Sequence, residues 1–174
     1  MPEGWSHQLE TWHEFYLLIG SAGFTLTGLL FVVVSFGAQT VADRVSTGVR
    51  AFVTPNAVHF CATLVVAAVL LIPNVPSLIV SVFLCLGALA SLGYLAYTKV
   101  HRRWRENKLP VLDWIWYVGL PTMSYVLLFL SGVGVLLRAL WSIYGIAVAL
   151  ILLLIIGIRN SWDLVIFMAR RENK

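Results

Sequence analysis

Polar side chains that could do chemistry inside a membrane lie in the second long apolar segment of the sequence. Asn56, His59 and Thr63 are spaced i, i+3 and i+7, so a helix would carry all three on one face. His59 lies within about 4 Å of the midpoint of the segment, given the rise of a helix. Polar groups are costly in hydrocarbon and usually face other helices or a cavity. The stripe therefore predicts a buried polar contact or a polar site at mid-membrane depth.

Two other apolar segments bring polar groups to the same depth. Thr25 lies near the middle of the first segment, and Ser124 and Tyr125 are central in the fourth, next to a bend that we expect at Pro121. We predict one mid-membrane polar layer that comprises Thr25, Asn56, His59, Ser124 and Tyr125. Three interpretations of the layer remain open. It is a set of hydrogen bonds that hold the helices together, which we favour, or a pore or ligand cavity, or a catalytic or cofactor site at His59.

The N-terminal region contains spacings that suggest metal ligands. Glu10 and His13 form one E-x-x-H motif, whereas a di-iron site needs two such motifs and two further carboxylates. His7, Glu10 and Glu14 are spaced i, i+3 and i+7, which leaves a surface divalent-metal site as an alternative. We favour an amphipathic lead-in helix over residues 5–14. Its apolar face would consist of Trp5, Leu9, Trp12 and Tyr16.

Familiar catalytic and cofactor motifs do not occur in the sequence. There is no H-E-x-x-H motif, no P-loop and no Rossmann glycine pattern. We therefore predict no catalytic residue, no metal and no cofactor, and we favour a protein that is not an enzyme.

The elements that must position these residues are membrane helices. The residue types AVILMFWYC make up 60% of the 174 residues and charged residues 11%, whereas soluble domains are about 25% charged. A soluble fold of this size cannot hide so much apolar surface. The same composition excludes intrinsic disorder, and the two cysteines exclude a disulfide scaffold. We predict an all-α, polytopic transmembrane bundle that forms a single integral membrane domain over residues 1–174.

Five segments are long enough to cross about 30 Å of hydrocarbon. They are Phe15–Phe36, Ala51–Ile72, Pro76–Tyr97, Trp114–Leu137 and Leu140–Ile158. The turn residues between the second and third spans predict a tight antiparallel hairpin. A break between the last two spans is expected at Arg138, with Gly132–Gly134 as the alternative. The fifth span has no polar side chain from Ile146 to Ile158, and we expect it at the periphery, facing lipid.

The basic residues predict the orientation of the bundle. With five spans, eleven of the twelve Lys and Arg residues fall on one side and Arg138 alone on the other. Positive residues are retained on the cytoplasmic side, so the N-terminus is expected outside and the C-terminus inside.

Two segments on the inner side are candidate docking or lipid surfaces. One is the basic loop with Arg102, Arg103 and Arg105, which could attract anionic lipids at the inner face. The other is an amphipathic segment over residues 159–171, in which Arg159 and Asp163 are spaced to pair. It is either a surface helix or a continuation of the fifth span. Nucleic-acid binding is not expected, because these basic residues lie against the headgroups.

The stretch Trp12–Phe36 resembles the opening of small multi-span bacterial inner-membrane proteins of uncharacterised function, and Gly157–Leu164 has a similar look. The resemblance implies a bacterial inner-membrane location and carries no activity, cofactor or functional residue. From the polar stripes and the small size we predict a homo-oligomeric channel or small-solute pore. The alternative is a regulatory or scaffolding subunit that docks a larger membrane complex, whose protein partner the sequence does not identify.

Overall fold

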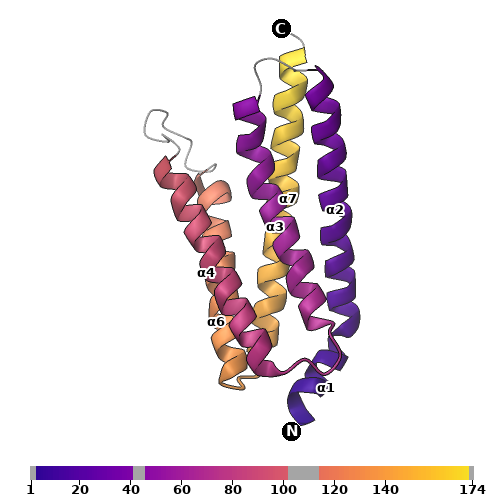
Figure 1. Cartoon of the computed structure of the whole chain (residues 1–174), viewed down its shortest axis with the longest axis vertical. Coiled ribbons are helices and arrows are strands. Elements are labelled where there is room, and N and C mark those ends of the chain that lie inside the picture. The colour runs from indigo at the N-terminus through magenta and orange to yellow at the C-terminus, as the bar shows by residue number, and fades with distance from the viewer. Residues whose placement is uncertain (1–2, 41–45, 102–113, 173–174) are drawn as a thin grey trace.

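The computed structural model describes residues 3–40, 46–101 and 114–172, and this part of the chain is helical without any strand. The elements are α1 (Glu3–Thr11), α2 (His13–Thr40), α3 (Ser46–Leu70), α4 (Ser77–His101), the π-helix η1 (Ile115–Gly119), α6 (Leu120–Leu136) and α7 (Ser142–Glu172). The long helices run along one common direction, and the two termini lie at opposite ends of the bundle (Figure 1). The all-α prediction is confirmed.

Four helical segments of the described chain are long and apolar enough to cross a membrane. They are His13–Ser35, Ser77–Tyr97, Ile115–Leu136 and Ser142–Asp163. The described apolar part of α3, Pro55–Leu70, is a shorter helix. These lengths and compositions are those of a membrane protein, and a count of five spans stays a prediction.

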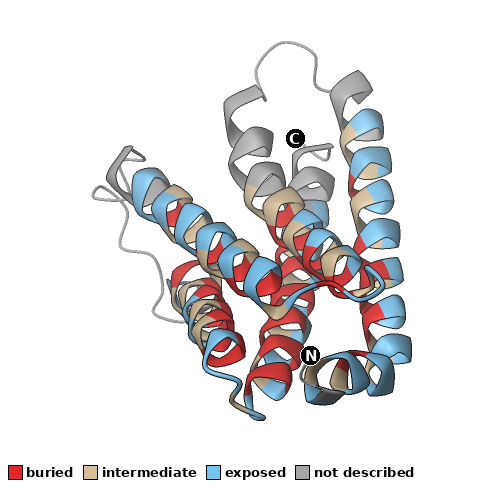
Figure 2. Ribbon diagram, turned by 60° about the horizontal axis from the view of Figure 1, so that its bottom comes forward, coloured by how far each residue is buried: buried red, intermediate tan, exposed pale blue. Residues whose placement is uncertain are grey.

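The position of α7 differs from the prediction. We expected the last span at the periphery, but Ile146, Leu150 and Leu153 are fully buried, and α7 packs against α2, α3 and α6. Figure 2 shows buried residues along the described length of this helix. Lipid tails are as apolar as leucine side chains, so an apolar helix is equally suited to lipid and to the centre of a bundle.

The hairpin between the second and third spans also differs from the prediction. The turn is present, with Asn74 in the left-handed conformation at φ 52°, but α3 and α4 diverge from it (Figure 1). α4 packs closely on α6 instead, where the Ser81 hydroxyl donates to the Gly132 carbonyl at 2.6 Å. A Cβ atom at Gly132 would lie 2.9 Å from Cys85 Sγ. The small residue at this position therefore permits the close approach of α4 to α6.

The chain reverses at the predicted break between the last two spans. α6 ends at Leu136, Arg138 has a left-handed φ of 58°, and α7 begins at Ser142. The Ser142 hydroxyl donates to the Ala139 carbonyl at 2.7 Å within this turn. From there α7 is continuous to Glu172, so the segment after the fifth span is a continuation of that span.

The first helix packs under the end of the bundle where the N-terminus lies (Figure 1). The Trp5 indole donates to the Val75 carbonyl at 3.2 Å, and Leu9 is buried. The Trp12 ring meets the Tyr144 ring edge-on, with centroids 5.1 Å apart. Helix α1 therefore covers only the first part of the predicted segment 5–14, because the chain turns at Trp12 and continues as α2. Its apolar face contacts protein.

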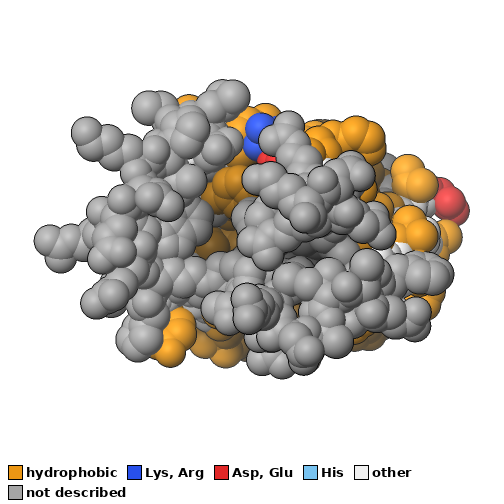
Figure 3. Space-filling model, turned by 90° about the horizontal axis from the view of Figure 1, so that it is seen from above, with side chains coloured by type: hydrophobic (Ala, Val, Ile, Leu, Met, Phe, Trp, Pro, Cys, Tyr) orange, Lys and Arg blue, Asp and Glu red, His pale blue; other side chains and the backbone are white. Residues whose placement is uncertain are grey.

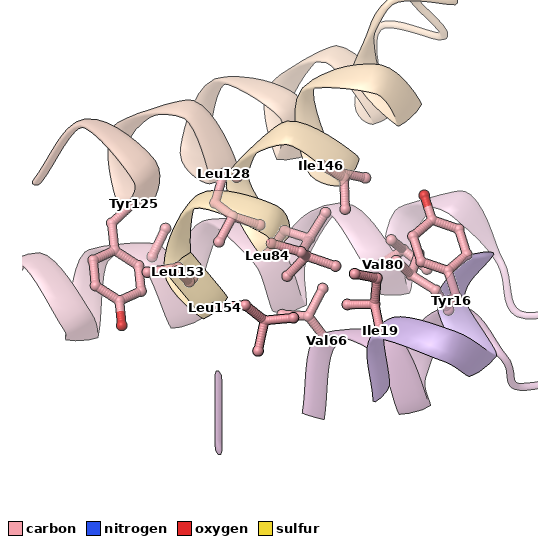
Figure 4. Close-up of a cluster of buried hydrophobic side chains, with 14 of the residues drawn as sticks. Tyr16, Ile19, Val66, Val80, Leu84, Tyr125, Leu128, Ile146, Leu153 and Leu154 are labelled. Carbon is pink, nitrogen blue, oxygen red and sulfur yellow. The ribbon is translucent and has the colours of Figure 1, made fainter. Parts of the chain in front are cut away.

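The core between the helices is a continuous apolar cluster. Figure 4 shows side chains from the packed helices meeting in its centre, among them Val66, Leu84 and Leu153. Tyr125 closes one end of the drawn cluster and Tyr16 the other.

Candidate functional site

One hydrogen bond connects two residues of the predicted polar layer inside the bundle. His59 Nδ1 of α3 and Tyr125 Oη of α6 lie 2.8 Å apart, and both residues are 2% exposed. The tautomer of His59 decides which of the two groups donates. Because each group supplies the partner that the other needs, the pair joins α3 to α6 at no cost in unsatisfied polar atoms.

The remaining members of the predicted layer form their hydrogen bonds with other partners. Ser124 is buried and donates to the Leu120 carbonyl of its own helix at 2.9 Å. Thr25 is exposed on α2 and donates to the Ser21 carbonyl at 2.9 Å. Asn56 is buried one turn before His59 and bonds to α7. The layer is thus a His59–Tyr125 pair with Asn56 beside it, while Thr25 faces away from the bundle.

A π-helical turn positions aromatic side chains at the same end of the bundle as the C-terminus. The Leu120 N–H bonds to the Ile115 carbonyl five residues earlier, and Pro121 follows directly. The proline ring has no N–H and would clash with the carbonyl four residues before it in a regular helix. A wider turn relieves that clash, and such turns are frequent at functional sites. The bend expected at Pro121 therefore takes the form of η1, which carries Trp116 and Tyr117.

These aromatic residues meet the charged pair on α7. The Arg159 guanidinium carbon lies 4.5 Å from the centroid of the Trp116 ring. Arg159 Nη1 and Asp163 Oδ2 are 3.7 Å apart, and the Tyr117 hydroxyl donates to the same Asp163 oxygen at 3.1 Å. The predicted i, i+4 pairing of Arg159 and Asp163 is therefore present, and two aromatic residues fix its orientation.

Two asparagines extend this group into the bundle. Asn56 Nδ2 donates to the Ser161 hydroxyl at 3.3 Å, and Asn56 and Asn160 are both buried. The side-chain carbonyl oxygens of both asparagines have no hydrogen-bond partner among the described residues. We define the α7 cluster as Asn56, Trp116, Tyr117, Arg159, Asn160, Ser161 and Asp163. It joins polar side chains of α3, η1 and α7, and its member Asn56 lies one helical turn from His59.

Two apolar grooves flank α3. The larger, of about 550 Å³, lies between α2 and α7 with Phe60 as its floor, and Arg159 and Ser161 are its polar lining residues. The smaller, of about 310 Å³, lies between α3 and α4, where Ser91 and Tyr125 contribute the polar atoms. Both volumes are in the range of ligand pockets, about 300–1,000 Å³. Both grooves are lined mainly by apolar side chains, whereas an aqueous pore is lined by polar groups.

One part of the predicted docking or lipid surface is not covered by the described residues. Arg102, Arg103 and Arg105 lie outside the described residues. Within the described ranges no three His, Cys, Asp or Glu side chains gather in a way that could hold a metal ion. Figure 3 shows a cationic and an anionic side chain next to each other among hydrophobic ones at the end of the molecule.

Sequence reasoning missed the α7 cluster as a unit. It assigned Asn56 to a mid-membrane layer, and Arg159 and Asp163 to a separate docking surface. The sequence did contain a signal for this cluster, namely the run Arg159-Asn160-Ser161 directly after a long apolar span. Consecutive polar residues at the end of a span need polar partners on neighbouring helices.

Comparison with protein-family models, with curated proteins and with solved structures finds no match to this chain. The resemblance of Trp12–Phe36 to bacterial inner-membrane proteins therefore stays a prediction.

Proposed function

We propose that the protein crosses a bilayer five times and acts as a regulatory or scaffolding subunit of a larger membrane assembly. The spans would be α2, α3, α4, the η1–α6 pair and α7, in a bacterial inner membrane. Termini at opposite ends of the bundle (Figure 1) support an odd number of crossings. The positive-inside rule supports an inner C-terminus, because this orientation puts eleven basic residues inside and Arg138 outside.

The observation that carries the scaffolding role is that His59, Tyr125 and Asn56 of the predicted polar layer each form a side-chain hydrogen bond within the chain. His59 and Tyr125 satisfy each other at 2.8 Å, and Asn56 bonds to Ser161. A pore would need polar groups that face water, whereas these are directed into a packed bundle. The function then resides in surfaces rather than in a lumen.

The chemistry of the partner follows from the charge of the inner side. In the proposed orientation this side holds eleven basic and five acidic side chains. Charge complementarity favours a partner that presents an acidic segment at the membrane surface. The basic loop with Arg102, Arg103 and Arg105 would provide the attraction.

A pore formed between copies is the second candidate. The observation in its favour is the exposed polar stripe of α2, where Ser21, Thr25 and Ser35 face outward. Against it, the Thr25 and Ser35 hydroxyls donate to the carbonyls one turn earlier, at 2.9 and 2.8 Å. These bonds leave the hydroxyls less available to line a channel.

Site-specific photo-crosslinking in native membranes tests the scaffolding role. A crosslinker at Trp114, which is 53% exposed next to η1, samples the inner end, and one at Leu137, 73% exposed, samples the opposite turn. We expect adducts with a second, acidic polypeptide at Trp114 and none at Leu137. Replacing Arg102, Arg103 and Arg105 by Gln should lower the Trp114 adduct several-fold.

Recovery of self-crosslinked species alone at both positions would contradict the scaffolding role. A liposome flux assay separates the two candidates, since the scaffold predicts negligible flux for the wild type. Flux in the wild type that a bulky change on the exposed stripe, Thr25→Trp, abolishes would favour the pore.

A further inference from the structure

The groove between α2 and α7 combines a long apolar wall with one arginine. We propose that it binds an anionic phospholipid of the inner leaflet, with one acyl chain along the groove and the phosphate at Arg159. This proposal rests on the orientation of the five spans proposed above, but not on the docking function, because it concerns the lateral face of the bundle and needs no protein partner.

The wall of the groove suits an acyl chain. Leu26, Leu30 and Val33 of α2 are spaced i, i+4 and i+7 and face α7 across the groove. Phe60 of α3, which is 1% exposed, closes the bottom. α2 and α7 each pack more closely on α3 than on each other, so the space between them is open to the side. In a bilayer this face is surrounded by hydrocarbon. An acyl chain therefore loses no favourable interaction when it moves from the lipid into the apolar groove.

Arg159 keeps donors for a phosphate. Its guanidinium uses one flat face on the Trp116 ring, which leaves the in-plane N–H groups at the edge. Nη1 is buried and has no hydrogen-bond partner within the described ranges, and the 3.7 Å to Asp163 is too long for a hydrogen bond. Asp163 is also held by the Tyr117 hydroxyl. An arginine stacked in this way is suited to bidentate phosphate binding.

The depth of Arg159 matches the phosphate region of a bilayer. It lies about 26 Å along α7 from Ser142 by helix rise, and the hydrocarbon core is about 30 Å thick. The neighbouring Trp162 is 66% exposed, as expected of an aromatic residue at the headgroup level. A helix from another protein would have to bring an acidic residue to this same depth, whereas every anionic phospholipid carries its phosphate there.

Lipid retention in nanodiscs tests the proposal. The protein is reconstituted in mixed phosphatidylglycerol and phosphatidylcholine, transferred to detergent, and analysed by native mass spectrometry for bound lipid. We expect one phosphatidylglycerol retained per chain in preference to phosphatidylcholine. Arg159→Gln should lower that preference at least fivefold, and Arg159→Lys should lower it less because a point charge remains.

Matched variants keep the test interpretable. Arg138→Gln removes the exposed arginine of the opposite turn and should leave lipid retention unchanged. Val33→Trp, which fills the groove, should reduce retention of both lipids while Arg159 is intact. Retention of phosphatidylglycerol that neither Arg159→Gln nor Val33→Trp alters would overturn the proposal. A photo-crosslinker at Leu29 that captures protein rather than lipid would overturn it too.

Discussion

At the scale of single residues, the His59–Tyr125 hydrogen bond links two helices of the bundle through two buried side chains. Tyr125→Phe keeps the ring and removes the hydroxyl, so that a buried imidazole nitrogen loses its partner. Hydrogen bonds between membrane helices contribute on average about 0.6 kcal/mol, and an unsatisfied buried group costs about 1–3 kcal/mol. We expect the variant to lower the free energy of unfolding by about 1 kcal/mol, measured by denaturant titration in mixed micelles.

A double-mutant cycle isolates this bond. His59→Ala and Tyr125→Phe should show a coupling energy of about 0.6–1.7 kcal/mol, because the second change removes an interaction that the first has already lost. Tyr144→Phe, at a tyrosine that is 61% exposed, is the control and should have no measurable effect. Additive effects of the two buried changes would show that the bond does not couple α3 to α6.

At the scale of elements, α7 approaches α3 closely because Gly157, which has no side chain, lies against the Phe60 ring. A Cβ atom at this position would overlap the Phe60 ring, and Phe60 is 1% exposed, so the ring or the helix would have to shift. Overpacking of this kind costs about 1–3 kcal/mol. We therefore expect Gly157→Ala to lower the thermal midpoint of unfolding by several degrees. The midpoint is measured as the temperature at which monodisperse protein is lost on size-exclusion chromatography.

Two further variants separate packing from helix propensity. Gly93→Ala introduces the same methyl group where nothing lies within 4 Å, and it should be neutral or stabilising because alanine favours helix. Phe60→Leu combined with Gly157→Ala should recover part of the lost stability, since the smaller side chain vacates the space. A Gly157→Ala protein as stable as the wild type would refute the close contact.

The helices themselves follow from the sequence, but their neighbours do not. Runs of apolar residues and the turn residues around Asn74 and Arg138 predict where helices begin and end, because each signal is local. The central position of α7 was predicted wrongly, since lipid and protein interiors reward the same side chains. The pairing of α4 with α6 depends on Gly132 and Ser81 meeting across the bundle, which no local pattern encodes.

The candidate site was predictable only in part, for the same reason. The face shared by Asn56 and His59 follows from helical spacing, and both residues are buried as expected. Their partners, Ser161 and Tyr125, lie 105 and 66 residues further along the chain. Which polar group satisfies which is decided by the packing of whole helices, so a single sequence supplies the candidates without the pairs.

At the scale of the whole molecule, charge and length together define how the bundle would sit in a bilayer. α7 has 31 residues and is about 46 Å long, which exceeds the hydrocarbon thickness of about 30 Å. Its last turns, with the basic residues that follow Asp163 in the sequence, would therefore extend beyond the inner surface. The opposite end carries the turn at Arg138 and the helix α1.

Thiol labelling of intact cells tests this arrangement. In a background with Cys61 and Cys85 replaced, single cysteines at Gly4 and Leu137 should react with a membrane-impermeant maleimide added outside. A single cysteine at Lys174 should react only after permeabilisation, because five crossings put the C-terminus on the cytoplasmic side. Equal external labelling at Gly4 and Lys174 would require an even number of crossings, and α3, with its shorter apolar stretch Pro55–Leu70, would then be the helix that fails to cross.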